Sequence, residues 1–314
     1  MSRCLVTGGA GFIGSTLAKR LLSRGDDVTI LDNLSAGKVT NIPDGAEFIH
    51  GDLSSITAFD KMDGRGFDAV FHLGSQASGE LSYEQPMADF ETNARGTLLL
   101  LQWCRRSEIE RIIFSSSRVV YADSVGPIPE DYPTKPQSYY GAAKLAGEAY
   151  MNLYHRIGGK PTIFRFFNVY GPRQNLENLK QGMASIYLVY IFRGDPVLVK
   201  GSLDRYRDFV YVDDVANALI AALENPTVSS GQTYNIGTGK KTTVRELISI
   251  MLRAFGHDPN TYPVDVVGGT PGDVPGSIAD IRKVTEELSW SPCVDVVEGI
   301  RRTAEWAKGL RRAN

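Results

Sequence analysis

A tyrosine and a lysine at helical spacing are the first residues in this sequence that could do chemistry. Tyr140 and Lys144 form the only Tyr-x-x-x-Lys pair in the chain. On a helix, residues four apart share a face, so the Lys144 ammonium would stabilise a tyrosinate and lower a pKa that starts near 10. With 14 tyrosines in the chain, the spacing alone is a weak signal of an acid–base site.

Three hydroxyl side chains follow an apolar segment upstream of this pair. Arg111–Phe114 reads as a strand, and Ser115-Ser116-Ser117 comes directly after it. In an open parallel sheet, ligands bind outside the carboxyl ends of the strands. We therefore expect these serines at a ligand-binding edge, with a plain polar strand end as the alternative.

A glycine-rich turn near the N-terminus has the pattern of a dinucleotide-binding loop. An expected strand, Cys4–Thr7, runs into Gly8-Gly9-Ala10-Gly11-Phe12-Ile13-Gly14, and a helical segment follows at once. Glycine is needed where the chain turns tightly and where backbone touches a pyrophosphate, and the helix N-terminus attracts the phosphates. Asp32 ends the next expected strand, where a carboxylate binds the adenosine ribose and favours NAD over NADP. Lys38 lies nearby and leaves NADP as the alternative.

The elements that must position these residues read as a doubly wound parallel α/β sheet of about seven strands. Short β-branched runs alternate with amphipathic segments such as Ser15–Ser23 and Thr97–Arg106. Continuous apolar strands separated by helices are typical of βαβ units covered on both faces. The expected strands are Cys4–Thr7, Asp27–Leu31, Glu47–Ile49, Ala69–Leu73, Arg111–Ser115, Thr162–Phe166 and a returning Gln232–Ile236.

The second half of the chain is less regular and predicts a smaller α/β substrate domain. Glycine and proline clusters divide it, and helices are expected at Val215–Leu223, Val244–Phe255 and about Val297–Leu310, the second begun by Thr242 or Thr243 with Glu246 in its first turn. We expect residues 1–168 to form the NAD-binding domain, with 210–236 returning to it. Residues 169–209 and 237–314 would then bind the substrate.

Composition narrows the class of protein. The net charge of −2 gives no global reason to bind nucleic acid or a membrane surface. Three widely spaced cysteines predict no disulfide framework, and neither a transmembrane run nor a signal peptide is visible, so we expect a cytoplasmic protein. The four histidines lack metal-ligand spacing, which predicts no metal site. His72 is expected to be a satisfied histidine at a strand end.

Taken together, the motifs resemble those of a known family. The chain resembles the extended short-chain dehydrogenase/reductases, most closely their nucleotide-sugar epimerase and dehydratase branch, and within it the UDP-sugar 4-epimerases. The resemblance covers essentially the whole chain and implies a Rossmann fold for the NAD-binding domain. It rests on Gly8–Gly14, Asp32, Ser115-Ser116-Ser117, Tyr140/Lys144, Phe167-Asn168-Val169-Tyr170-Gly171-Pro172, Arg207–Asp214 and Pro271-Gly272-Asp273.

The resemblance also implies a role for each matching position. For NAD, it implies the pyrophosphate at Gly8, Gly11, Phe12, Ile13 and Gly14, the adenosine ribose at Asp32, Asn33 and Ser35, the adenine edge at Asp52 and Leu53, and the nicotinamide side at Leu73, Asn93 and Ser115. For the substrate, it implies the nucleotide diphosphate at Asn168, Arg207 and Asp273. A guanidinium matches phosphate oxygens with its planar fork. The alternative for Arg207 is a surface salt bridge with Asp208 or Asp204.

Three departures from the family pattern bear on function. The family's Arg-x-Gly-Asp reads Thr270-Pro271-Gly272-Asp273, so one phosphate-binding arginine is missing, and Arg205 or Lys200 could replace it. The Tyr-Gly after the serine strand reads Tyr121-Ala122. Where the 4,6-dehydratases carry Asp-Glu, this chain has Arg118-Val119, which removes the acids that would eliminate water.

The mechanism that the resemblance implies is a transient oxidation at C4 of a UDP-linked sugar. Tyr140 takes the proton of the 4-hydroxyl while C4 gives a hydride to the nicotinamide, Ser117 hydrogen-bonds the same oxygen, and Lys144 binds the nicotinamide ribose. The 4-keto sugar then turns over and takes the hydride back. A dehydratase, a 4-ketosugar reductase and, as a different class, an NAD-sensing regulatory protein are the alternatives.

Two further expectations concern assembly and substrate choice. The expected helices around Thr97–Arg106 and Tyr140–Arg156 carry apolar residues on more than one side, namely Leu98, Leu99, Leu101 and Trp103 on the first and Leu145, Ala149 and Leu153 on the second. In the family such helices pair across a two-fold axis, so we expect a homodimer. Ser277, four residues after Asp273, matches a position that controls space around C2 of the sugar, and a serine there would admit a 2-acetamido group. Arg118 could meet a C6 carboxylate, as in UDP-glucuronate, or make an outward salt bridge.

Overall fold

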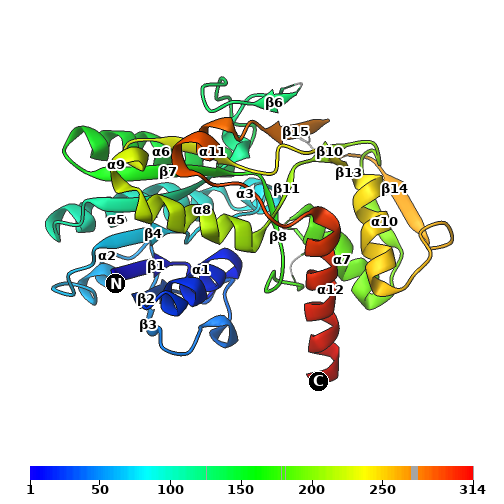
Figure 1. Ribbon diagram of the computed structural model, residues 1–314, viewed down its shortest axis with the longest axis horizontal. Helices are drawn as coiled ribbons and strands as arrows, with labels where there is room; N and C mark the ends of the chain where they lie inside the picture. The colour runs from blue at the N-terminus through cyan, green and yellow to red at the C-terminus, as the bar shows by residue number, and fades with distance from the viewer. Residues whose placement is uncertain (125, 178, 181, 270–274, 314) are drawn as a thin grey trace.

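A parallel sheet of seven strands forms the larger part of the fold (Figure 1). The structure is a computed structural model that describes residues 1–124, 126–177, 179–180, 182–269 and 275–313. In spatial order the strands are β12 (Thr233–Ile236), β7 (Lys160–Phe166), β5 (Arg111–Ser117), β4 (Ala69–His72), β1 (Arg3–Thr7), β2 (Asp27–Asp32) and β3 (Glu47–His50). The order reverses direction at β1, which confirms the expected doubly wound α/β architecture.

Alternation along the strands sends side chains into two separate cores. Cys4 and Val6 of β1 face one core, whereas Leu5 between them faces the other. Both faces are therefore buried, which explains why the strands read as continuous apolar runs. The first core is covered by α1 (Phe12–Ser23), α8 (Val212–Glu224) and α11 (Arg282–Leu288), and the second by α2 (Ile56–Asp60), α5 (Gly96–Arg106) and α6 (Tyr139–Arg156).

Each expected strand is present, with its end moved by a residue or two. The change that matters most is in β5, which extends through Ser117, so all three serines belong to the strand itself. The strand β4 ends at His72, whose ring nitrogens lie 2.8 Å from Thr7 Oγ1 and 2.9 Å from Thr97 Oγ1. Burial lowers the pKa of His72 to about 3. This confirms that His72 is a satisfied, neutral core histidine.

A smaller and less regular part lies beside the sheet (Figure 1). Its helices α7 (Met183–Arg193), α10 (Val244–Phe255) and α12 (Val296–Ala313) share a third core with short strands. The helix α10 begins as expected, with Thr243 and Glu246 forming a capping box. The strands form a four-stranded sheet, β13 (Thr242–Thr243), β10 (Tyr206–Arg207), β15 (Gly276–Ala279) and β6 (Pro127–Ile128), and two pairs, β8 (Asn168–Tyr170) with β11 (Phe209–Tyr211) and β9 (Val197–Lys200) with β14 (Val264–Val267).

Several segments cross between the two parts. The strand β12 pairs with β7, and α8 packs against α1 on the large sheet. Two further crossings were not expected. The helix α11, from the predicted substrate domain, covers the large sheet, and the strand β6, from the predicted NAD-binding domain, joins the small sheet. The remaining short helices are η1 (Val39–Asn41), α3 (Gly79–Glu84), α4 (Pro86–Phe90), η2 (Glu91–Arg95), η3 (Arg118–Val120) and α9 (Pro226–Ser229).

The helix α5 corrects one detail of the expected dimer face. Leu101 and Trp103 lie in the core of their own subunit, and the Trp103 indole donates a hydrogen bond to Asp63 Oδ1 over 2.8 Å. Only Leu98 among the large apolar side chains of α5 is exposed. Leu101 and Trp103 were expected at the dimer contact, and this was wrong. Both pack into the core of the chain itself, because an apolar helix can contact the sheet on one side and a neighbouring segment of the same chain on another.

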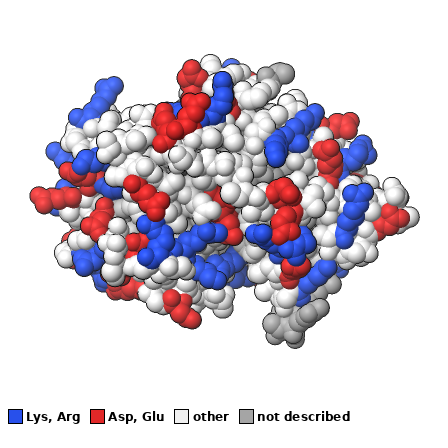
Figure 2. Space-filling model, viewed as in Figure 1, with Lys and Arg blue, Asp and Glu red and all other residues white. Residues whose placement is uncertain are grey.

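The surface carries both signs of charge. Figure 2 shows lysine and arginine interspersed with aspartate and glutamate on one face of the molecule. Ion pairs such as Arg20–Asp213 and Lys38–Glu177 account for part of this pattern. None of the helices that the structure describes is both long and apolar enough to cross a membrane.

Candidate active site

The helix α6, which carries Tyr140 and Lys144, contacts β5 and the short helix η3 that follows it. Ser138 caps α6 by accepting a hydrogen bond from the backbone N–H of Gly141 over 3.0 Å. This places Tyr140 in the first turn and Lys144 one turn later. Gly147 lets the helix approach the sheet, because a Cβ there would come within 2.6 Å of the Phe114 ring.

The half-buried Tyr140 phenol lies close enough to the Ser117 side chain to interact with it. Burial raises the pKa of Tyr140 to about 12, and the hydrogen bond with the Ser117 side chain opposes that rise only in part. The sequence led us to expect a lowered pKa. The structure differs because removal of water from the phenol outweighs the favourable groups around it.

Lys144 is held close to the tyrosine without touching its hydroxyl. Its Nζ donates to the carbonyl of Ser115 over 2.8 Å and lies 6.0 Å from the centroid of the Tyr140 ring. Burial lowers the pKa of Lys144 to about 7, although the charges of Asp89 and Glu148 raise it. A single strand and a single helix thus bring Ser115, Ser117, Tyr140 and Lys144 together.

The glycine turn leaves room for a pyrophosphate. A Cβ on Gly14 would lie 2.2 Å from the carbonyl oxygen of Gly8, so the turn closes only without one. The helix α1 starts at Phe12, followed by Ile13, and neither its N-cap, Gly11, nor its first turn supplies an acidic cap. Its first N–H groups are therefore suited to an anion.

Acidic and amide side chains follow β2, where an adenosine would be held. The Asp32 carboxylate accepts N–H bonds from Ala10 over 3.0 Å and Leu34 over 2.8 Å. Asn33 donates to Asp52 over 2.7 Å and accepts from the Ser35 N–H over 3.0 Å. Leu53, next to Asp52, is buried. The resemblance implies that these residues hold the ribose and adenine of NAD, and the structure places them together after β2 and β3.

The residues expected on the nicotinamide side differ in how many hydrogen bonds their side chains already make within the protein. Leu73 follows β4 directly and is partly buried against the sheet core. The Ser115 hydroxyl donates to the carbonyl of His72 over 3.0 Å. Asn93 accepts from Ser75 and Gln76 and donates to Gln76 and Asp89, so its amide shapes the loop at 75–76.

Arg207 and Ser277 lie together on the substrate side. They are paired in the parallel register of β10 and β15, each with about 2% of its surface exposed. Asn168, on β8, donates to the backbone carbonyl of Asp208, the residue that follows Arg207, over 3.1 Å. Asp273 falls outside the residues that the structure describes.

Sequence reasoning missed the role of Asp208. Its buried carboxylate accepts four hydrogen bonds, from the N–H and hydroxyl of Thr238 and from the N–H groups of Gly239 and Ala279. Asp204, the other partner considered for Arg207, pairs with Arg245 over 3.7 Å. Asp208 therefore fixes the strand that carries Arg207 and is not the partner of a surface salt bridge.

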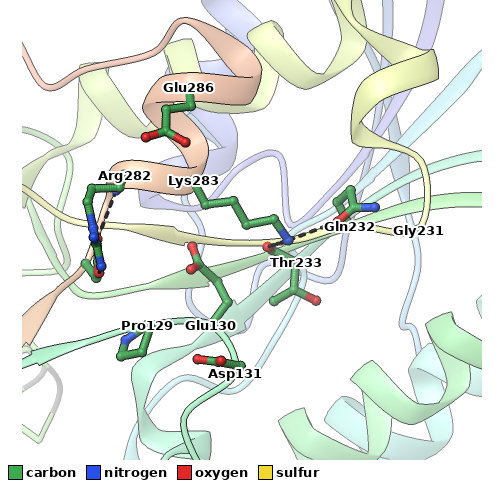
Figure 3. A pocket seen from close by; sticks show the side chains of 10 residues that line it. Pro129, Glu130, Asp131, Gly231, Gln232, Thr233, Arg282, Lys283 and Glu286 are labelled. Atoms are coloured by element: carbon green, nitrogen blue, oxygen red, sulfur yellow. Dashed lines mark hydrogen bonds and ion pairs between the residues drawn. The ribbon is translucent and has the colours of Figure 1, made fainter.

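A groove on another part of the molecule does not belong to this site. Figure 3 shows it at the edge formed by β12 and α11, where Lys283 points to Gln232 and Thr233. Its volume is about 540 Å³, and its charged groups largely pair with neighbours such as Arg282 with Asp280. None of the residues that line it is a candidate catalytic or cofactor residue.

Comparison with known proteins adds independent information. The model of the NAD dependent epimerase/dehydratase family matches residues 4–237. The structure of Thermotoga maritima UDP-glucose 4-epimerase with UDP-glucose is 36% identical, with a TM-score of 0.93 over 98% of this chain and 99% of that one. Thermus thermophilus UDP-glucose 4-epimerase in complex with NAD is 36% identical, with a TM-score of 0.90 and the same coverage. UDP-N-acetylglucosamine 4-epimerase of Methanobrevibacter ruminantium, in complex with UDP-N-acetylmuramic acid, is 30% identical, with a TM-score of 0.91 over 98% and 99% of the chains.

The buried lysine generates a prediction about stability. The folded pKa of Lys144, about 7, lies below the model value of 10.5, so the unfolded chain binds more protons between these values. Wild-type stability should therefore rise as the pH increases from 7 toward 10.5. Lys144→Met should raise the free energy of unfolding at pH 7 by about 0.5–2 kcal/mol while abolishing activity.

Denaturant unfolding of nucleotide-depleted protein at pH 7 and pH 10 measures this effect. The advantage of Lys144→Met should shrink at the higher pH, because pH 10 lies close to the unfolded pKa of 10.5 and folding then needs little free energy to deprotonate the amine. Lys19→Met, on the exposed side of α1, is the control and should change stability little at either pH. The assignment would be contradicted if the free energy of unfolding gained by Lys144→Met over wild type were smaller at pH 7 than at pH 10.

Proposed function

The chain belongs to the NAD dependent epimerase/dehydratase family, and from that premise we propose that it catalyses the 4-epimerisation of a UDP-linked hexose. The observation that carries the proposal is the intact group of Ser117, Tyr140 and Lys144 beside Arg118-Val119, where a dehydratase would need two acids. A 4-ketosugar reductase would consume NADH, whereas an epimerase has no net redox change.

The chain's own residues supply proton transfer and orientation. NAD, when bound, would supply the hydride acceptor and donor for C4 of the sugar. Tyr140, as the phenolate, takes the proton of the 4-hydroxyl and gives it back after the 4-keto sugar has turned over. Ser117 hydrogen-bonds the same sugar oxygen and shares a hydrogen bond with the Tyr140 phenol.

The electrostatics explain why both the lysine and the cofactor are required. Tyr140 is protonated near neutral pH, because burial raises its pKa to about 12. The cationic forms of Lys144 and of the nicotinamide both stabilise the phenolate when NAD binds beside the tyrosine. Ionisation of the base is thereby coupled to occupation of the cofactor site.

Replacement of the acid–base oxygen tests the reaction directly. Tyr140→Phe should reduce turnover by about 10²–10⁴-fold, because only the group that moves the proton is lost. Turnover is measured by NMR with a panel of UDP-hexoses, and NAD is quantified after denaturation of each protein. NAD content should match wild type. Retention of more than a tenth of the wild-type rate would show that Tyr140 is not the base.

We further propose that Ser277 sets the space around C2 of the sugar. Ser277 is small, buried and adjacent to Arg207 across the β10–β15 register. A tyrosine at this position would fill space that a 2-acetamido group needs. On this basis UDP-N-acetylglucosamine and UDP-N-acetylgalactosamine are substrates alongside UDP-glucose and UDP-galactose.

Ser277→Tyr should abolish turnover of the two N-acetylated substrates and spare the plain hexoses. Because the position is buried, the melting temperature of the variant is recorded, and Ser277→Ala is the matched control that keeps the space open. NMR time courses with all four sugars give the comparison. Equal losses on both kinds of sugar in a folded variant, or no wild-type activity on either acetamido sugar, would refute the assignment.

Exposed apolar side chains on α3 to α6 support a homodimer. These helices pack against one another, and Leu98 and Leu153 are 40% and 58% exposed on the two longest of them. A surface of this kind is typical of a protein–protein contact. The exposed set on these helices and at their ends comprises Tyr83, Met87, Phe90, Leu98, Tyr139, Leu153 and Ile157.

A charge on this surface should separate the subunits. We expect wild-type protein at about 10 μM to sediment as a dimer and Leu153→Glu to sediment as a monomer, since a carboxylate would be buried without a partner. Val228→Glu, on an exposed side chain of α9, is the control and should stay dimeric. A wild-type monomer would overturn the proposed assembly.

We propose the cytoplasm as the location of the protein. Cys4 and Cys104 are buried free thiols, and Cys293 is an exposed free thiol. Free cysteines are compatible with a reducing compartment.

A further inference from the structure

Arg118 is a cation without a hydrogen-bond or ion-pair partner among the described residues. It follows Ser117 directly and begins the short helix η3. Within the part of the chain that the structure describes, no hydrogen bond or ion pair engages its guanidinium. Asp123 is close enough to act on it electrostatically but forms no ion pair with it. The outward salt bridge considered as an alternative for Arg118 is therefore not formed.

The environment of this guanidinium destabilises the folded protein. Arg118 is half-buried, and burial lowers its pKa to about 10. A cation that has lost water without gaining an acid destabilises the folded protein. Such an arrangement is expected where an anion binds and supplies the missing contact.

A second buried arginine, Arg207, is close enough to be affected by the charge of Arg118. Burial lowers the pKa of Arg207 to about 9, and the charge of Arg118 is the largest neighbouring influence in the same direction. The two guanidinium groups therefore lie close enough to repel each other. They come from different sheets, since Arg118 follows β5 and Arg207 lies on β10.

An unsatisfied hydroxyl lies on the strand that pairs with the Arg207 strand. Ser277 is paired with Arg207 in the β10–β15 register, and its buried Oγ has no hydrogen-bond partner among the described residues. Buried hydroxyls are normally hydrogen-bonded. This second observation is independent of the charges and also indicates a ligand with oxygen acceptors.

The other cations considered for this task are engaged elsewhere. Lys200 Nζ lies 3.7 Å from Glu80 Oε2, and both side chains are well exposed. Arg205 donates to the carbonyl of Ser202 over 3.1 Å and to that of Lys200. Neither provides a buried donor of the kind that Arg118 offers where the family arginine is replaced by Thr270.

We propose that Arg118 is a substrate-binding residue that contacts an anionic oxygen group of the nucleotide sugar, together with Arg207. Two sources offer this chemistry, the diphosphate of UDP and the C6 carboxylate of a hexuronate. In the first case Arg118 replaces the arginine missing at position 270. In the second it selects UDP-glucuronate. The inference rests on the proposed function, because it requires a UDP-sugar in this site.

Calorimetric binding of UDP, UDP-glucose and UDP-glucuronate to the NAD-bound protein tests the proposal. If the guanidinium binds the diphosphate, Arg118→Met should lower the affinity for all three ligands by about tenfold or more. If the guanidinium binds the carboxylate, the variant should lower the affinity for UDP-glucuronate alone. Arg118→Lys keeps the charge without the planar fork and should fall between wild type and Arg118→Met. Arg245→Met, on the exposed side of α10, is the matched control.

The outcomes separate this inference from the proposed function. Unchanged affinities in a folded Arg118→Met protein would overturn it, and the lysine variant serves the same comparison if the methionine variant does not fold. Wild-type protein that binds UDP-sugars without epimerising them would refute the proposed function and leave the role of Arg118 standing. Wild-type protein that binds none of the three ligands would overturn both.

Discussion

A buried ion pair between α6 and β7 fixes the geometry on which the site depends. Arg165 donates from Nε to Glu148 Oε1 over 2.9 Å and from Nη2 to Oε2 over 2.6 Å, and the Ser116 hydroxyl bonds the same carboxylate. Loss of one partner from such a pair leaves an uncompensated buried charge, at a cost of about 3–5 kcal/mol. The pair locks the helix against β5 one turn after Lys144, and the proton-transfer groups are thereby set against Ser117.

Close contact between helix and sheet also sets the protonation states. The absence of a side chain at Gly147 lets α6 approach Phe114 closely, so that Lys144 is buried and Tyr140 is half-buried. Desolvation raises the pKa of the phenol and lowers that of the amine, so the protein alone favours the neutral forms of both. A cationic cofactor beside them shifts the balance toward phenolate. The site is therefore poised for the cofactor at some expense of stability.

Local patterns predicted most of the fold and the closeness of Ser117 to Tyr140 and Lys144. Each expected strand formed, and the capping box at Thr243 was correct, because these features depend on neighbouring residues. The Glu148–Arg165 pair and the four bonds to Asp208 could not be predicted, since their partners are distant in sequence. Trp103 was misplaced for a related reason, because helical periodicity does not show whether a second apolar side meets the same chain or another one.

The central claim is that hydride leaves C4 and returns to the same carbon within one active site. UDP-hexose deuterated at C4, drawn from the substrates that the enzyme accepts, tests this in ordinary water. The account predicts that the 4-epimer carries deuterium at C4 and no solvent hydrogen there, as read by proton NMR and mass spectrometry. Solvent hydrogen at C4 of the product would contradict it, because the label would then have been lost from the bound cofactor or exchanged by a different mechanism.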